Sequence, residues 1–209
     1  MTNSFSTAIR ELRALTPSCP LADFQARSIA ERQAMKLLEL FDQHEAPVDV
    51  SLIAELPRVE VVLRNTRQLA GLSGLSEWSK GRWLIAVNKD DSPTRRRFTL
   101  AHEIKHVIDH PFMRVLYVDR WGRTNDQRVE DMCDYFAACI LMPRPWVKHA
   151  WTTLTQDQTQ LAAYFRVSPA AMARRLADLK LSEPTTRYHQ DESVARYFRA
   201  GTVDMPVTA

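Results

Sequence analysis

The chain has 209 residues, 45% of them hydrophobic, which is enough to bury a core in one domain. Its net charge of +3 is too small to require a nucleic-acid partner, because the basic residues are scattered among acidic ones. The sequence has no apolar run long enough to span a membrane and no secretion signal in residues 1–10, and its three cysteines favour a reducing compartment, so we expect a cytoplasmic protein.

The N-terminal part predicts one long amphipathic helix that serves as scaffold. Apolar residues recur at helical spacing from a cap near Ser18 to Phe41. Pro17 and Pro47 bound this segment because proline interrupts a helix.

Two strands are predicted next, Val59–Leu63 and Trp83–Asn88, because both are rich in β-branched and aromatic residues. Gly71–Gly74 between them is interpreted as a turn. The second strand leads into the next helix, and we expect it to pair with an extended peptide substrate through main-chain hydrogen bonds.

A bounded helix is predicted after the second strand. Ser92 is a good N-cap, Pro93 suits the first helical position, and Pro111 ends the helix. The residues expected to anchor this helix in the core recur at helical spacing and are Phe98, Ala101, Ile104 (or Lys105) and Ile108.

The same helix carries the HExxH pattern of zinc hydrolases. His102 and His106 are four residues apart, so both lie on one face and can bind one zinc ion through neutral imidazoles. Glu103 lies beside the metal, where it can take a proton from an activated water and return it to the leaving amine. Taken alone, the pattern also fits two buried, hydrogen-bonded histidines.

A second helix, Val129 to Pro143, supplies a candidate for the third ligand that an open zinc site needs. Asn125 or Asp126 could cap it. Glu130 and Asp134 share one face, which fits a zinc ligand and a carboxylate that accepts a hydrogen bond from a ligand histidine. An ordinary pair of solvated acids is the alternative.

Together these residues resemble the ImmA/IrrE-type metallopeptidases over about residues 50 to 180. The matching positions are Gly71–Gly74, Trp83–Asn88, Arg97–Glu103, His106, His110, Glu130, Asp134, Phe136–Ala138 and Leu141–Pro143. The resemblance implies a gluzincin-like site in which His102, His106 and Glu130 bind zinc. It also implies that Glu103 is the general acid and base. Lys105 departs from the family, where glycine is common, and this bears on helix packing or partner choice more than on chemistry.

The segment from Thr159 to Leu176 resembles a helix-turn-helix. Its small core would consist of Leu161, Phe165, Val167, Met172 and Leu176. DNA binding would place Arg174, Arg175 and Lys180 against a duplex. We favour the alternative in which these helices pack on the peptidase or receive its substrate, because one helix pair with modest charge binds DNA weakly.

The sequence therefore predicts an α+β fold, a mainly helical zincin-like peptidase with a small twisted β-sheet beside the HExxH helix and a C-terminal helix-turn-helix-like segment. Residues 1–182 would form one metallopeptidase domain, comprising a helical scaffold (1–50), a catalytic core (51–145) and a C-terminal helical segment (146–182). Residues 183–209 are expected to form a short helix and a flexible tail.

The predicted function is zinc-dependent cleavage of a protein partner. The family resemblance suggests a helix-turn-helix repressor or antitoxin, whose loss derepresses a mobile-element or stress response. The alternatives are a protein that binds or sequesters a partner without hydrolysis, or DNA binding through residues 159–176. The group that stabilises the oxyanion stays open among Tyr117, His110 and an arginine.

Overall fold

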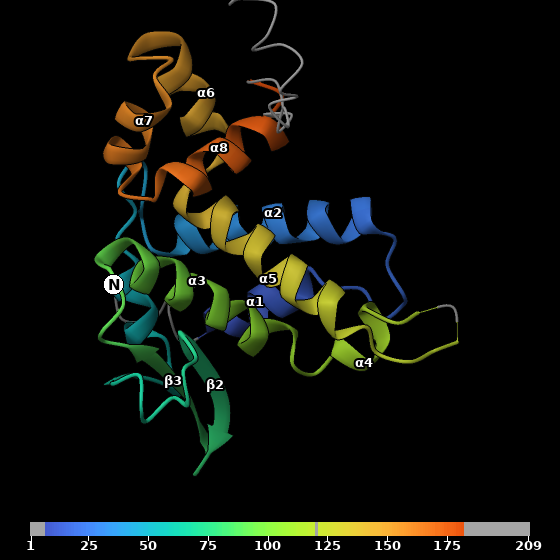
Figure 1. Cartoon of the computed structure of the whole chain (residues 1–209). Coiled ribbons are helices and arrows are strands. Elements are labelled where there is room, and N and C mark those ends of the chain that lie inside the picture. The colour runs from blue at the N-terminus through green and yellow to red at the C-terminus, as the bar shows by residue number, and fades with distance from the viewer. Residues whose placement is uncertain (1–6, 120, 182–209) are drawn as a thin grey trace, which may run out of the picture.

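The computed structural model describes residues 7–119 and 121–181 (Figure 1). The predicted tail, 183–209, lies outside these residues. Within them the fold is α+β, as predicted, with helices packed around one small sheet. No helix in this part of the chain combines the length and apolar character needed to cross a bilayer.

The N-terminal region forms two helices, α1 (Ala8–Ala14) and α2 (Asp23–Leu40). The predicted long helix is confirmed as α2, although it begins at Asp23 and not near Ser18, and α1 was not predicted. Pro20 explains the later start, because a proline disfavours helical backbone at the residue before it. Gln25 then accepts a hydrogen bond from the Ala22 N–H (2.9 Å) and fixes the first turn of α2.

The sheet contains β1 (Val59–Arg64), β2 (Gly74–Ser79) and β3 (Arg82–Asn88) in the order β1-β3-β2. A short 3-10 helix, η2 (Val50–Glu55), precedes it. β1 runs parallel to β3, and β2 runs antiparallel to it. Both predicted strands are confirmed.

Strand β2 was not predicted, and its first residue, Gly74, was interpreted as the end of a turn. It also corrects the substrate-pairing prediction, because β3 is the central strand and both of its edges are occupied. The Asn88 N–H donates to the Ser73 carbonyl (2.8 Å). This bond determines which residues of β2 hydrogen-bond to β3, because such residues alternate along an antiparallel strand. The main-chain groups of Gly74, Ser76 and Trp78 therefore point away from β3 along the free edge of the sheet.

The two predicted motif helices are confirmed as α3 (Pro93–Asp109) and α5 (Asp126–Leu141). Ser92 caps α3 by accepting the Arg95 N–H (3.2 Å), and Asn125 caps α5 by accepting the Arg128 N–H (3.1 Å). A short helix, α4 (Met113–Leu116), lies between them. Figure 1 shows α3 lying between the sheet and α5, with α2 along the other side of α5.

The core lies where these helices meet. Its fully or almost fully buried residues from α2, α3 and α5 include Leu37, Leu38, Ala101, Ile104, Ile108, Cys133, Phe136, Cys139 and Ile140. Cys133 and Cys139 are both buried and free, as expected for core packing. Burying such side chains contributes about 1.5–3 kcal/mol each, so the packing of α5 on α3 is strongly favoured.

The C-terminal segment comprises α6 (Arg144–Thr153), α7 (Gln158–Phe165) and α8 (Pro169–Asp178). All five residues predicted for the small core of the α7–α8 pair are buried. Arg166 adopts a left-handed backbone (φ 52°) in the turn between them.

The DNA-binding alternative, which was not favoured, would place Arg175 against a duplex, but the side chain of Arg175 is buried. Its Nε donates to the Met142 carbonyl (3.0 Å), and its guanidinium lies 3.7 Å from Glu31 and above the Tyr135 ring. Arg175 thus anchors α8 to α2 and α5.

Candidate metal centre

Three side chains from two helices point their donor atoms at one another. His102 and His106 project from one face of α3, with their Nε2 atoms 3.1 Å apart. Glu130 faces them from α5, with Oε2 3.2 Å from His102 Nε2 and Oε1 3.4 Å from His106 Nε2. The structure therefore brings the three predicted ligands together.

The spacing of these atoms fits a metal ion. Tetrahedral coordination with metal–ligand bonds of about 2.0–2.1 Å places the ligand atoms about 3.3–3.4 Å apart. The observed separations of 3.1, 3.2 and 3.4 Å match this value. Two neutral imidazoles and a carboxylate also form a common donor set of open metal sites, which leave one position for water or substrate.

Asp134 lies where it can orient His102. Its Oδ1 is 2.9 Å from His102 Nδ1, so it accepts that N–H and leaves the Nε2 lone pair facing His106 and Glu130. Burial lowers the pKa of His102, but the hydrogen bond to Asp134 and the nearby carboxylates outweigh burial and raise it above the ordinary value. For His106, burial and the neighbouring His102 lower the pKa, which favours the neutral imidazole that binds metals.

Glu103 is buried next to these ligands without being one of them. Burial raises the pKa of its carboxyl group, while His102 and Ser76 act in the opposite direction. A carboxylate with a raised pKa beside the metal position is suited to accepting and releasing a proton.

Gly74 allows strand β2 to lie directly against this part of α3. A Cβ at this position would lie 2.4 Å from the Cγ2 of Thr99 and 3.2 Å from Oε1 of Glu103. Sequence reasoning missed the role of Gly74, although a glycine within a strand often marks a close approach of another element.

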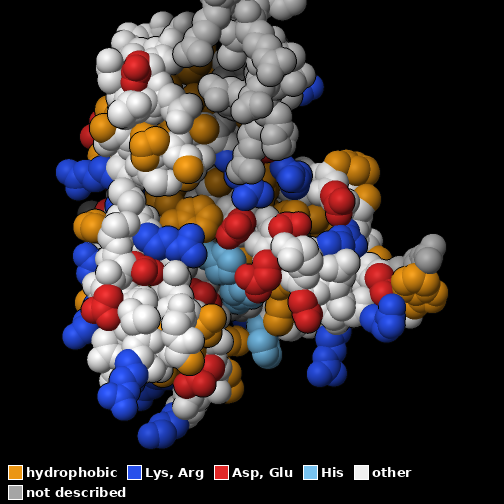
Figure 2. Space-filling model, in the orientation of Figure 1, with side chains coloured by type: hydrophobic (Ala, Val, Ile, Leu, Met, Phe, Trp, Pro, Cys, Tyr) orange, Lys and Arg blue, Asp and Glu red, His pale blue; other side chains and the backbone are white. Residues whose placement is uncertain are grey.

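The donor atoms lie in a cleft between β2 and α5. Two cavities of about 390 and 440 Å³ lie along it, and both are lined by Gly74, His102, Glu103 and Glu130. Figure 2 shows histidine side chains in this furrow with acidic side chains along one wall. The outward main-chain groups of β2 border the same cleft, so an extended peptide could lie beside them.

Cys133 offers an alternative third donor. Its Sγ and the ring nitrogens of His102 and His106 all lie within 4.8 Å of one another. The oxygens of Glu130 lie 3.2 and 3.4 Å from those nitrogens, at the separation that tetrahedral coordination requires. Cys133 is also buried beneath the cleft, and burial raises the pKa of its thiol well above the ordinary value. The geometry therefore favours Glu130.

Two of the three candidates for oxyanion stabilisation can be located. Tyr117 is buried and donates its hydroxyl to the buried Asp109, so it is not available to a substrate in the cleft. His110 is exposed, lines the cavity beyond His106, and has its ring 4.9 Å from that of Trp83.

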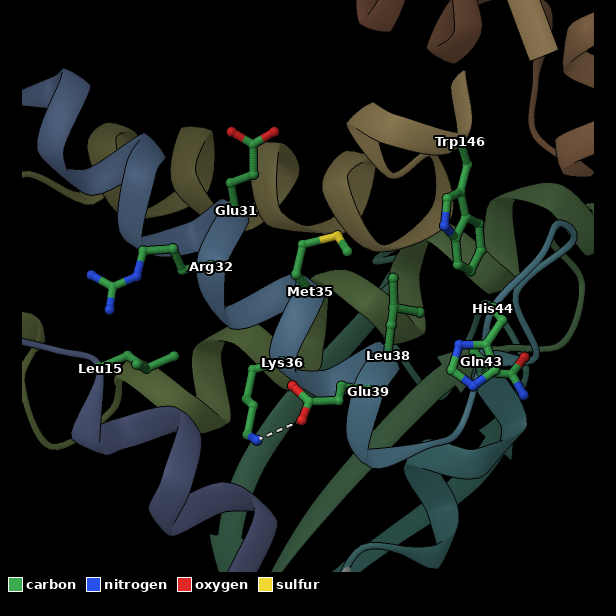
Figure 3. A pocket seen from close by; sticks show the side chains of 10 residues that line it. All are labelled: Leu15, Glu31, Arg32, Met35, Lys36, Leu38, Glu39, Gln43, His44 and Trp146. Carbon is green, nitrogen blue, oxygen red and sulfur yellow. Dashed lines mark hydrogen bonds and ion pairs between the residues drawn. The ribbon is translucent and has the colours of Figure 1, made fainter. Parts of the chain in front are cut away.

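A larger cavity of about 570 Å³ lies elsewhere, along α2 (Figure 3). Met35, Leu38 and Trp146 form its apolar part, and Lys36 pairs with Glu39 (3.2 Å) at its rim. None of the residues that line it belongs to the donor cluster. We therefore identify the candidate site by the donor atoms that lie close together in the cleft, and not by the volume of the cavity.

Residues 60–177, which include both motif helices, match the sequence model of a peptidase family, the IrrE N-terminal-like domain. The chain belongs to this family. Membership supports the metallopeptidase interpretation and a bound metal. The matched region contains all the candidate ligands of α3 and α5.

Similar proteins agree over a shorter region. The chain is 40% identical over 65 residues to the radiation response metalloprotease IrrE of Deinococcus radiodurans, covering 30% of this chain and 20% of that protein. It is 38% identical over 63 residues to the IrrE of Deinococcus deserti, covering 29% of this chain and 22% of the relative. The matches thus span about a fifth of each relative's length.

Among solved structures, a Mycobacterium tuberculosis transcriptional regulator resembles this protein with a TM-score of 0.54 at 14% identity. The match covers 81% of this chain and 51% of the regulator. At this identity the similarity concerns the fold alone.

Proposed function

We propose that this protein is a zinc-dependent endopeptidase that cleaves a protein partner in the cytoplasm. The observation that carries the proposal is the triangle of donor atoms from His102, His106 and Glu130, with the buried Glu103 beside it. Family membership supports a protease role. The proposal adds the metal, the class of substrate and the roles of the residues.

In this mechanism His102, His106 and Glu130 hold the zinc ion, and Asp134 keeps His102 in the tautomer that binds it. When bound, the ion polarises the scissile carbonyl and lowers the pKa of a water molecule to about 7. Glu103 accepts the proton of the attacking water and donates it to the leaving amine.

Strand β2 positions the substrate. The outward main-chain groups of Gly74, Ser76 and Trp78 can hydrogen-bond an extended peptide, so that the scissile bond lies over the donor triangle. Because Gly74 lacks a side chain, the peptide and Glu103 can approach the same point. His110, at the far end of the cleft, is our candidate for stabilising the oxyanion.

We propose a helix-turn-helix repressor or antitoxin as the substrate, whose cleavage derepresses a mobile-element or stress response. The Deinococcus relatives are radiation response metalloproteases, and this supports the stress-response part. In this zincin-like arrangement the α7–α8 pair packs on the peptidase and receives the substrate. Arg175, which DNA binding was expected to use, is occupied by internal contacts.

The test compares the wild-type protein with Glu103→Gln, using purified helix-turn-helix repressors and antitoxins as candidate substrates. We expect about one zinc ion per chain in both proteins and cleavage by the wild type alone, because Glu103 is not a ligand. If the wild type and Glu103→Gln have the same effect on the partner, catalysis is not the function, and this protein binds or sequesters its partner instead. Salt-dependent binding of duplex DNA by the full chain would instead favour the DNA-binding alternative.

A further inference from the structure

A third cavity extends the catalytic cleft toward α8. It has a volume of about 470 Å³ and shares Arg95, Phe98 and Asp134 with the cavity beside the metal centre. The cleft therefore continues from the donor triangle to the space between the first turns of α3 and α8. A chain bound along β2 has a continuous path into this space.

The walls of this cavity are largely apolar. Leu141 and Val167 are buried, and Phe98 and Ala171 are half-buried. Phe98 also lies beside the metal centre, with its ring centroid 6.5 Å from that of His102. A hydrophobic side chain two or more residues from the scissile bond would lose water on entering this space.

The entrance of the cavity carries positive charge. Arg95 donates from Nε to the Ser73 hydroxyl (3.2 Å), and the exposed Arg174 lies 3.9 Å from Oδ2 of Asp134. The facing carboxylate of Asp134 already accepts the N–H of His102 through Oδ1. Two guanidinium groups thus face one carboxylate that is already engaged. The N-terminal ends of α3 and α8 face the same space and add to its positive potential.

We propose that this cavity binds an acidic, partly apolar segment of the cleaved protein. A carboxylate of the substrate lies between Arg95 and Arg174, and a neighbouring apolar side chain packs on Phe98 and Leu141. The assignment rests on the proposed peptidase function, since the occupant is the substrate chain continuing from the metal centre. It gives α8 a specific role, which is to select the sequence near the cleavage site.

The test measures binding of three fluorescent peptides of alternating glutamate–leucine, glutamine–leucine and lysine–leucine to zinc-loaded Glu103→Gln protein, which binds without cleaving. We expect the glutamate peptide to bind at least about fivefold more tightly than the glutamine peptide and the lysine peptide to bind least. Arg174→Glu, added to this protein, should abolish the preference. Ala170→Trp, which fills the cavity without changing charge, should weaken the glutamate peptide. Arg64→Glu, on β1, is the charge-matched control and should change nothing.

The cavity assignment is overturned if the three peptides bind alike, if Ala170→Trp has no effect, or if Arg64→Glu weakens binding as much as Arg174→Glu. Cleavage of the candidate repressors by the wild type is measured in parallel. Cleavage without peptide preference would refute the cavity assignment and leave the peptidase function standing. Peptide preference without any cleavage would refute the peptidase function and leave the cavity as a binding site for acidic, partly apolar peptides.

Discussion

The two faces of helix α3 use ionisable residues in opposite ways. The cleft face carries His102 and His106, whose Nε2 atoms lie 3.1 Å apart and face the Glu130 carboxylate, and the buried Glu103 lies beside them. On the adjacent face, which is turned into the core, Lys105 and Asp109 are each only 1% exposed and are paired within the protein. One helix thus carries candidate metal ligands and, next to them, a buried ion pair whose charges are satisfied within the protein.

The buried pair is part of a wider network. Lys105 donates to Asp109 (2.8 Å) and to Oε1 of Gln33 on α2 (2.7 Å), and Tyr117 donates to Asp109. The Tyr117 carbonyl accepts the N–H of Asn125 (2.7 Å), the residue that caps α5. The network therefore connects the helix that carries the histidines to the start of the helix that carries Glu130. We infer that one face binds the metal while the other fixes the distance between the ligands.

The largest expected effect is on the cleft face. Glu130→Ala removes one of the three ligands, so we expect loss of stoichiometric zinc and at least about a thousandfold loss of cleavage. The unfolding free energy of the metal-free protein should barely change, because the Glu130 side chain is half exposed (54%). Zinc analysis and urea denaturation measure the two effects. Glu39→Ala, an exposed acid on α2, is the control, and equal zinc loss in it would contradict the assignment.

On the buried face the expected effect is on stability. Lys105→Met leaves the Asp109 carboxylate buried without its cation, which should lower the unfolding free energy by about 3–5 kcal/mol. Replacing both residues, as Lys105→Met with Asp109→Leu, should cost less than the single change. Lys36→Met, which breaks a half-exposed pair with Glu39, should cost about 0–1 kcal/mol. Similar costs for Lys105→Met and Lys36→Met would show that the buried pair has no special role.

A smaller effect is expected for Asp134, which acts on the metal through His102. Asp134→Ala should weaken zinc affinity about 10–100-fold while leaving the three ligands in place. Competition with a chelator measures this affinity. Asp131→Ala, on the exposed side of the same helix, should leave it unchanged. If Asp131→Ala has an equal effect, the role of Asp134 is general charge and not orientation.

The smallest effect is expected where β2 meets α3. Gly74→Ala places a Cβ against the Cγ2 of Thr99, which should lower the unfolding free energy by about 1–2 kcal/mol and slow cleavage. Thr99→Ser removes that methyl group, so the double variant should recover part of both losses. Failure of the double variant to recover would mean that the contact with Thr99 is not the cause.

The sequence predicted those parts of the site that depend on local patterns. The i, i+4 spacings of His102 with His106 and of Glu130 with Asp134, and the caps Ser92 and Asn125, are visible within one helix. The structure places all four spaced side chains together. Their chemical roles stay predictions until metal is measured.

Features that depend on distant partners could not be predicted in this way. Strand β2 has little β-branched character and forms because β3 offers it an edge. Lys105 was interpreted as a change in packing or partner choice, since its partner Gln33 lies 72 residues away. Arg175 resembled a surface arginine until its contacts with α2 and α5 were known.

X-ray absorption at the zinc edge of the zinc-loaded wild-type protein tests the central claim most directly. The account predicts only nitrogen and oxygen neighbours at about 2.0–2.2 Å, from two imidazoles, the Glu130 carboxylate and solvent. A zinc–sulfur distance of about 2.3 Å would instead assign Cys133 as a ligand. That result, or the absence of any bound zinc, would contradict the three-ligand site proposed for His102, His106 and Glu130.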